Sequence, residues 1–504
     1  MARWFSITCS AVAVFAIVFA WSRRHVGLFP PLAEDVKNTS RWSLDWKSHV
    51  EECNCLSGKL EDEEIGSCKL KGTVSDCCCD YATVNHLNQY HLHPMVSKLV
   101  TLPFFRYFKV NLWCDCPLWP DDGMCALQAC SVCECEESEV PKNWQEEEKR
   151  QPVPSCKGEG GDEDFPVDRT VEPAIKKRLV NLPGWRGFNN PWMGEDKEDK
   201  EYSYINLLVN SERYTGYKGE DAQRVWTAIY SQGCFEGSTN PGEDACTEKR
   251  VFFRLISGLH SSITAHIAKD FLVDEELGVW GPNLDLFEWK LGRPEFRSRV
   301  ENLYFAFSFV LRAVIRAQPL LEGVDYTTGS PEEDKETAEL LGELVNNAAL
   351  QKACPVPFDE GRLWKGDQGP ELRNQLQSSF QNITRIMDCV GCEKCRLWGK
   401  LQTLGIATAL KILFHVDDCD SGLSQSQLTN LILERNEVIA LVNLLERLSQ
   451  SVETYRVMSI MLEERNAQKM TSDEKLTPTQ PEENLGGEND VQEMEKSHPE
   501  KPVQ

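Results

Sequence analysis

The stretch Cys389-Val-Gly-Cys-Glu-Lys-Cys-Arg-Leu-Trp-Gly-Lys400 joins three cysteines, spaced three residues apart, to the start of a strongly helical pattern. Leucines and isoleucines then recur at steps of about three to four as far as Leu413, which predicts an apolar stripe on one helix face. A helix that includes Cys389, Cys392 and Cys395 would place their sulfur atoms along one side of its first turns.

Cysteines at a helix N-terminus are suited to redox chemistry. Free N–H groups and the helix dipole favour the thiolate and lower the pKa, and Lys394 and Arg396 add positive charge nearby. Such a dithiol opens and closes readily. Structural disulfides are one alternative. Zinc or an iron–sulfur cluster is another, but it needs a fourth ligand or a recognised spacing, and we expect no metal.

Composition restricts the partners and the compartment. A net charge of −25 argues against nucleic acid and against an anionic membrane surface as the main partner. Of the 21 cysteines only Cys9 lies in the N-terminal apolar run, and the remaining 21 − 1 = 20 form an even number. This is typical of a secretory protein with disulfide bonds.

The N-terminus predicts entry into the secretory pathway. The uncharged run Trp4–Trp21 is long for a signal peptide and just long enough to cross a bilayer. Residues 1–24 are therefore a signal peptide or a signal anchor; we favour the anchor, followed by a lumenal stem over residues 25–52. Asn38 and Asn382 begin glycosylation sequons, and the second is expected on an exposed loop.

Residues 53–141 form a cysteine-rich part that begins with few apolar side chains and therefore needs disulfide staples. Nested pairs from Cys53 and Cys55 to Cys79 and Cys77 are our expectation, although sequence does not fix the connectivity.

A second cysteine-rich stretch carries Cys125 and Cys130 in a loop-like region with acidic surroundings. A disulfide here could shuttle between a partner's dithiol and a buried redox centre, or it could be a structural staple. Spacing alone leaves both interpretations open.

The remaining chain divides by composition. Residues 142–202 hold charge runs with Gly and Pro, which predicts an acidic flexible insertion that Cys156 tethers. Residues 203–465 carry helical patterns, and no convincing period-two alternation occurs, so we predict a mainly α body. Residues 466–504 are expected to form a disordered acidic tail.

Three segments resemble the endoplasmic reticulum oxidoreductins, which are flavin-dependent thiol oxidases. They are Arg385–Phe414, Glu212–Gly219 and Arg254–Ser262. The phrases Phe104–Pro117 and Trp364–Gly366 look closest to the plant branch of that family. The resemblance implies a single helical-bundle domain that encloses FAD, with cysteine-rich loops, in the lumen of the endoplasmic reticulum.

The resemblance also implies which residues contact FAD. The matching positions are Arg213, Thr215, Trp226, Ser257, His260, Lys290 and Arg299. Lys290 stands where the family has an arginine; it keeps the charge but lacks the planar fork. Without the family each of these residues is a weak signal, because a Trp or His on a helix is more often part of the core than a cofactor ligand. No G-x-G-x-x-G follows a strand, so a Rossmann flavin site is not expected.

By the same resemblance, electrons pass from protein disulfide isomerase to the shuttle pair Cys125/Cys130, then to Cys392/Cys395, FAD and molecular oxygen, with release of hydrogen peroxide. Cys389 resembles an outer cysteine that pairs near Cys116. The cysteines assigned structural or regulatory roles are Cys53, Cys55, Cys77, Cys79, Cys116, Cys135, Cys156, Cys234, Cys246 and Cys389.

Two questions stay open at this point. Cys133 and Cys135 lie close enough in sequence to the shuttle pair for either to trap one of its members. The alternative function from another class is a non-catalytic, disulfide-rich lumenal binding or scaffold protein, which would be colourless and would not consume oxygen.

Overall fold

The computed structural model describes residues 81–120, 123, 125, 127, 130–145, 190–193, 202–212, 216–232, 245–274, 276–351, 363–364, 369–414 and 431–476. The chain divides into two compact units, residues 1–458 and 459–504. The predicted signal segment, the stem and the first cysteine cluster lie outside the described residues. Among the described residues, none of the helices has the length and hydropathy needed to cross a bilayer.

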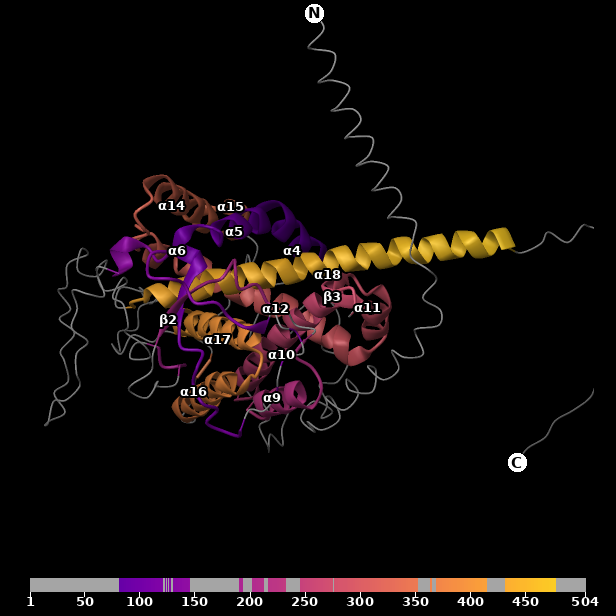
Figure 1. Ribbon diagram of the computed structural model, residues 1–504, viewed down its shortest axis with the longest axis horizontal. Coiled ribbons are helices and arrows are strands. Elements are labelled where there is room, and N and C mark those ends of the chain that lie inside the picture. The colour runs from indigo at the N-terminus through magenta and orange to yellow at the C-terminus, as the bar shows by residue number, and fades with distance from the viewer. Residues whose placement is uncertain are drawn as a thin grey trace, which may run out of the picture. The chain divides into compact units, whose positions relative to one another are not determined.

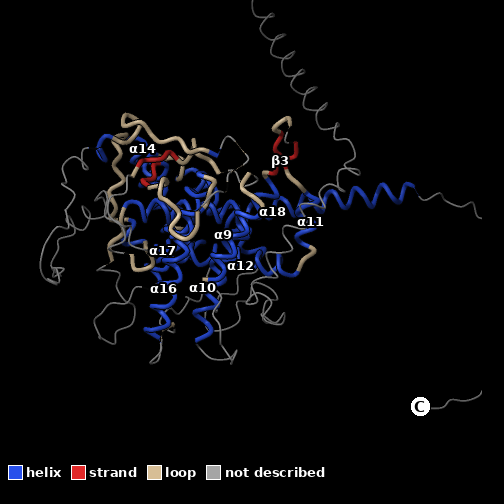
Figure 2. Tube along the Cα trace, turned by 60° about the horizontal axis from the view of Figure 1, so that its bottom comes forward, coloured by secondary structure: helices blue, strands red, loops and turns tan. Residues whose placement is uncertain are grey.

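The described part of the chain is mainly helical, as predicted (Figures 1 and 2). The helices near the beginning are α4 (Tyr81–Leu87), the π-helix η1 (Asn88–Leu92), α5 (His93–Leu99) and α6 (Pro103–Arg106). Proline lies at N1 or N2 of both α5 and α6, where its missing N–H removes no intrahelical hydrogen bond.

The central helices follow: α9 (Glu220–Ser231), α10 (Ala245–Lys269), α11 (Leu284–Leu291), α12 (Pro294–Arg316), α13 (Gln318–Leu321), α14 (Pro331–Asn346) and α15 (Ala348–Gln351). Helices α10 and α12 pack along each other. The segment 303–315 lies in α12, where Leu303, Val310 and Val314 are fully buried. Burial on several faces explains why this segment is almost continuously apolar.

The last elements are α16 (Gly369–Ile386), the 3-10 helix η4 (Met387–Cys389), α17 (Glu393–Leu413) and α18 (Arg435–Leu476). Helix α17 joins α18 through a buried ion pair, in which Lys411 Nζ lies 2.9 Å from Glu437 Oε2. Asn190 also donates to Glu437, over 2.8 Å. This cluster therefore fixes α17, α18 and residue 190 to one another.

Two small antiparallel sheets were not expected from the sequence. Strand β1 (Tyr107–Val110) pairs with β2 (Ser203–Asn206), with Tyr107 opposite Asn206 (Figure 2). Strand β3 (Phe271–Asp274) pairs with β4 (Val279–Gly281) across a turn. Each strand has four residues or fewer, too short for a readable alternation, and the partner of β1 lies far along the chain.

The structure corrects two predicted boundaries. The acidic insertion at 142–202 is not wholly flexible, because Trp144 and Trp192 are each 1% exposed within the hydrophobic core. The Trp192 ring lies 6.5 Å or less from the rings of Trp364, Phe380 and Phe414. At the other end, helix α18 continues to Leu476, into the tail predicted to be disordered from residue 466.

Candidate active site at the start of helix α17

Cys392 and Cys395 lie at the beginning of α17, but the three cysteines do not share one helix. Cys392 is the N-cap residue, with non-helical φ and ψ of −76° and 110°, and its sulfur accepts a hydrogen bond from the backbone N–H of Cys395 over 3.3 Å. Cys389 belongs to the preceding 3-10 helix. The predicted single row of sulfur atoms is therefore wrong, because the chain turns between residues 389 and 393.

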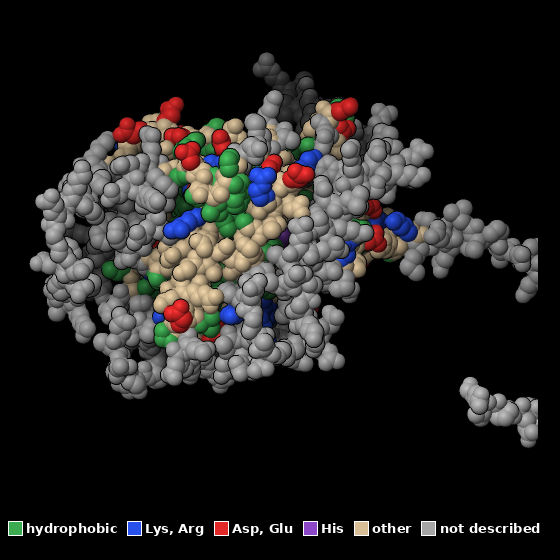
Figure 3. All heavy atoms as spheres, turned by 90° about the horizontal axis from the view of Figure 1, so that it is seen from below, with side chains coloured by type: hydrophobic (Ala, Val, Ile, Leu, Met, Phe, Trp, Pro, Cys, Tyr) green, Lys and Arg blue, Asp and Glu red, His purple; other side chains and the backbone are tan. Residues whose placement is uncertain are grey.

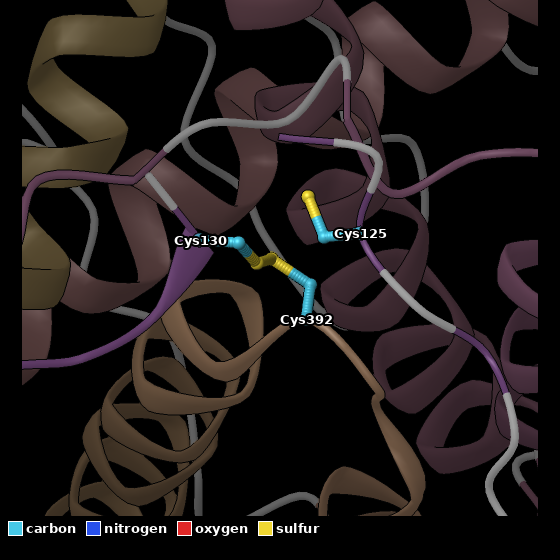
Figure 4. A group of neighbouring side chains, drawn as sticks. All are labelled: Cys125, Cys130 and Cys392. Atoms are coloured by element: carbon cyan, nitrogen blue, oxygen red, sulfur yellow. A yellow bond between two sulfur atoms is a disulfide. The ribbon is translucent and has the colours of Figure 1, made fainter. Parts of the chain in front are cut away.

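Two disulfides connect this region to the second cysteine-rich stretch. Cys116 pairs with Cys389, as the family resemblance implied. Cys130 pairs with Cys392, with their Cα atoms 5.9 Å apart, and Cys125 lies beside this bond (Figure 4). The sulfur atoms of Cys125, Cys130 and Cys392 all lie within 4.8 Å of one another. The structure thus joins one member of each expected redox pair, instead of Cys125 to Cys130 and Cys392 to Cys395.

The segment that brings Cys130 to this position is held by hydrogen bonds; we call Gly123, Cys125, Leu127 and residues 130–135 the arm. The backbone N–H of Val132 donates to Glu393 Oε2 over 2.7 Å. Asn210 accepts from the N–H of Cys133 and donates to its carbonyl, each over 2.9 Å. The arm is therefore fixed both to the first residue of α17 and to the segment after β2.

The first turns of α17 are anchored by side chains that reach other segments. Trp398 Nε1 donates to the carbonyl of Asn210 over 2.9 Å, and Arg396 Nη1 donates to that of Leu112 over 2.6 Å. Lys400 donates to the Asn111 carbonyl over 2.7 Å and forms an ion pair with Asp388. Arg396, which the sequence suggested as a charge for the thiols, thus also serves to hold the helix in place.

The electrostatics of Cys395 differ from the prediction. Burial raises the pKa of the Cys395 thiol well above its ordinary value, and the negative charges of Glu212 and Cys125 raise it further. Burial also raises the pKa of Cys125. The prediction that the helix start lowers the pKa is therefore wrong for Cys395. Glu212 is itself buried and pairs with Arg447 over 3.0 Å.

The two cysteines suggested as traps stand apart from the disulfide. Cys133 is an exposed thiol, and Cys135 is a partly buried one. Burial and the neighbouring charge of Glu139 raise the pKa of Cys135 to about 11. A thiol with so high a pKa reacts slowly at neutral pH. Whether either cysteine traps a shuttle cysteine stays a prediction.

Four of the proposed cofactor residues lie on α9, α10 and α11, and three of them gather around one aromatic platform. The Trp226 ring stacks on His260 with centroids 3.8 Å apart, and the Tyr230 hydroxyl lies 2.8 Å from His260 Nδ1. Ser257, one helical turn before His260, is buried and accepts from Asn302 Nδ2 over 3.0 Å.

Lys290 and Arg299 are the two cations among the described residues that the resemblance assigns to the cofactor. Lys290 is buried at the end of α11, and burial together with the charge of Arg299 lowers its pKa to about 7. Two cations that repel each other in this way would be stabilised by a diphosphate. A flat aromatic platform and paired cations are the groups that a flavin dinucleotide requires, so the residues present fit FAD.

Other predicted site residues cannot be placed, or lie elsewhere. Asn382 is exposed but lies within α16, not on a loop, and its amide donates to Gln232 Oε1 over 2.9 Å. Cys246 lies within α10, and its side chain is outside the described residues. Also outside them are Arg213, Thr215, Asn38, Cys53, Cys55, Cys77, Cys79, Cys156 and Cys234.

No motif or spacing in the sequence predicts several residues of the site. Asn210 and Glu393 contact the arm, and Asn302 ties Ser257 to α12. Asparagine and glutamate at these places are ordinary polar residues of a helical protein, and only the tertiary structure assigns them partners. Glu212 lies in a quoted segment, but its position beside Cys395 depends on the fold.

A helical body that brings sulfur atoms from two distant segments within bonding reach defines a protein built for thiol–disulfide exchange. Residues 91–455 match the family model described as Endoplasmic Reticulum Oxidoreductin 1. The chain belongs to this family of oxidoreductases, as the sequence analysis anticipated.

Individual relatives agree with the assignment. The chain is 50% identical to "Endoplasmic reticulum oxidoreductin-2" of Arabidopsis thaliana over 81% of each protein, which supports the plant branch. It is 36% identical to "ERO1-like protein alpha" of Homo sapiens, over 76% of this chain and 89% of that protein. A solved structure of Ero1p, titled as the source of disulfide bonds for oxidative protein folding, shares 29% identity and a TM-score of 0.52. That match covers 77% of this chain and 99% of the other.

Proposed function

We propose that this chain is a thiol oxidase of the endoplasmic reticulum that reoxidises protein disulfide isomerase and uses FAD and molecular oxygen. The observation that carries the proposal is the group formed by Cys125, Cys130 and Cys392, whose sulfur atoms lie within 4.8 Å of one another. Because Cys130 is bonded to Cys392 while Cys125 and Cys395 are thiols, the arrangement corresponds to the midpoint of a disulfide transfer.

The transfer can be written as three balanced exchanges. The isomerase dithiol attacks the Cys125–Cys130 disulfide and leaves oxidised, so that both chain cysteines become thiols. The Cys130 thiolate then attacks Cys392 and expels Cys395 as a thiolate, which gives the Cys130–Cys392 bond. Finally, the Cys125 thiolate attacks Cys130, which restores the outer disulfide and leaves Cys392 and Cys395 reduced.

The residues that would hold FAD are Trp226 and His260 as the ring platform and Lys290 with Arg299 for the phosphates. When bound, the flavin accepts two electrons from the inner dithiol and delivers them to oxygen, which yields hydrogen peroxide. The chain's own part in this step is to hold Cys395 partly buried in the first turn of α17. Partial burial limits the access of water and of competing thiols to the inner pair.

The surface near the arm suits a protein partner. Trp113, Leu118, Leu208 and Val209 are large hydrophobic side chains that are each 46% exposed or more, and they flank Cys116 or Asn210 in sequence. Hydrophobic side chains also gather between lysines and arginines on the face in Figure 3. Exposed apolar groups of this kind favour contact with another protein.

The apolar run 4–21 would deliver the chain to the lumen and, if uncleaved, attach it to the membrane.

The decisive experiment is the absorption spectrum and oxygen uptake of the purified protein. A yellow protein that consumes oxygen with reduced isomerase is expected, and Cys395→Ala and Cys130→Ala should each abolish this turnover. Cys114→Ala, a thiol outside the exchange group, is the matched control and should retain it. A colourless protein that takes up no oxygen would instead support the non-catalytic scaffold.

A further inference from the structure

The arm is seated on residues from three separate parts of the fold, which we call the cradle: Asn210, Gly216, Asp221 and Glu393. Asn210 follows β2, Asp221 lies in the first turn of α9, and Glu393 opens α17. These segments meet only through the tertiary structure. Each member contacts a different part of the arm, so the arm's position is specified at several points.

Asn210 is itself rigidly placed before it contacts the arm. It is 1% exposed, its Nδ2 donates to the Asn206 carbonyl over 3.0 Å, and its own carbonyl accepts from Trp398. In this setting it pairs with both backbone groups of Cys133. A side-chain amide that satisfies a backbone N–H and C=O together fixes the position and the direction of that residue.

Glu393 connects the arm directly to Cys392, the cysteine that Cys130 attacks. It follows Cys392 in the chain, and its carboxylate accepts from Val132, which lies two residues after Cys130. Cys130 and Cys392 are therefore each within two residues, along the chain, of one partner of this hydrogen bond. A shift of the arm by one residue would break this bond and move Cys130 away from Cys392.

Two close approaches at glycines, one in the cradle and one in the arm, complete the contact. A Cβ at Gly216 would lie 2.5 Å from Leu127 Cγ and would also clash with Cys125 Sγ. A Cβ at Gly123 would lie 2.7 Å from Asp221 Cβ. Separations below 3 Å leave no room for a side chain. The arm's side chains therefore pack on the backbone of Gly216, and its own backbone at Gly123 packs on the Asp221 side chain.

We propose that Asn210 and Glu393 are positioning residues that dock the arm so that Cys130 meets Cys392. The proposal deepens the proposed function, since it explains how the second exchange is directed. In that exchange the Cys130–Cys392 bond forms as the Cys392–Cys395 bond breaks, and Cys395 leaves with the electron pair. The cradle acts by raising the effective concentration of one sulfur at the other.

The test measures that effective concentration without flavin turnover, isomerase or oxygen uptake. In a Cys125→Ala/Cys395→Ala background, Cys130 and Cys392 form their bond with oxidised glutathione, which is released as two molecules of reduced glutathione. Equilibration in glutathione buffers and peptide mass spectrometry give the fraction bonded. We expect Asn210→Ala to lower the effective concentration about tenfold, since two hydrogen bonds to the arm are lost.

Glu393→Ala should lower it roughly three- to tenfold, and Glu393→Gln should recover most of the loss because an amide oxygen still accepts from Val132. Glu371→Ala is the matched control, since Glu371 is an exposed first-turn acid of α16. In Glu371→Ala, the effective concentration of Cys130 at Cys392 should equal that in the Cys125→Ala/Cys395→Ala background. Gly216→Ala should also lower the value, through Leu127.

An unchanged effective concentration in Asn210→Ala and Glu393→Ala would overturn the proposal. So would an equal fall in Glu371→Ala, because that result would reflect helix stability and not docking. Thermal unfolding of each reduced variant identifies any that fails to fold; the comparison then rests on Glu393→Ala with its glutamine rescue. Because this bond forms without FAD, its outcome is separate from that of the oxygen-uptake experiment.

Discussion

At Cys395, the surroundings of a single residue outweigh the local helix. Burial is the largest cause of its raised pKa, and the charge of Glu212 is the next. A helix N-terminus stabilises a nearby thiolate by a fraction of a pKa unit to about one unit, which burial exceeds. Because only the thiolate is alkylated, alkylation of Cys395 should become faster as the pH rises toward its raised pKa.

Replacing Glu212 tests this account. Glu212→Gln removes a negative charge that raises the pKa of Cys395, so the pKa should fall, although burial keeps it above the ordinary value. The pH profile of Cys395 alkylation in a Cys392→Ala background should therefore move to lower pH. Glu371→Gln, far from any cysteine in sequence and exposed, should leave the profile unchanged. A shift to higher pH in Glu212→Gln would contradict the assignment.

Lys290 predicts how FAD binding depends on pH. Without ligand its pKa is about 7, and a bound diphosphate would raise it, so binding above pH 7 requires uptake of a proton. FAD affinity should then be constant below pH 7 and should decrease as the pH rises above it. Fluorescence titration of the apoprotein measures this. Lys290→Arg should flatten the dependence because arginine stays charged, whereas equal slopes in both proteins would exclude this role for Lys290.

At the scale of the elements, helix α17 depends on close contact with α18. A Cβ at Gly405 would lie 2.7 Å from both the Ala440 carbonyl oxygen and Leu444 Cβ. Only glycine lets the two backbones approach this closely. The sequence predicted α17 from its apolar stripe, but a stripe of leucines carries no information about which position must stay without a side chain.

Substitution of two helical glycines makes this contact testable. Gly405→Ala should decrease the free energy of unfolding by about 1 to 3 kcal/mol, because overpacking forces the helices apart. Gly342→Ala, in α14, meets nothing within 4 Å and should increase it by about 0.5 to 1 kcal/mol. Denaturant unfolding of both variants gives the comparison. Stabilisation by Gly405→Ala would show that the helices tolerate separation.

Across the whole molecule, the Cys116–Cys389 disulfide joins segments 273 residues apart, directly before the active-site helix. Cys389→Ser should lower stability by about 2 to 5 kcal/mol, since the bond restricts a long loop in the unfolded chain. Calorimetry of the purified protein measures the loss. Cys116→Ser and the double variant should match it, because all three remove the same bond. A much larger loss in one single variant would point to damage other than the missing bond.

The amino-acid sequence by itself determined the helical class and the apolar stripe of α17, and it marked Cys389, Cys392 and Cys395 as candidates for redox chemistry. These features arise from local periodicity and from motifs within single segments. The tertiary structure alone decided that Cys130 meets Cys392, that Asn210 and Glu393 hold the arm, and that the pKa of Cys395 is raised. Pairing, burial and charge proximity join residues hundreds of positions apart, and no pattern along the chain encodes such distances.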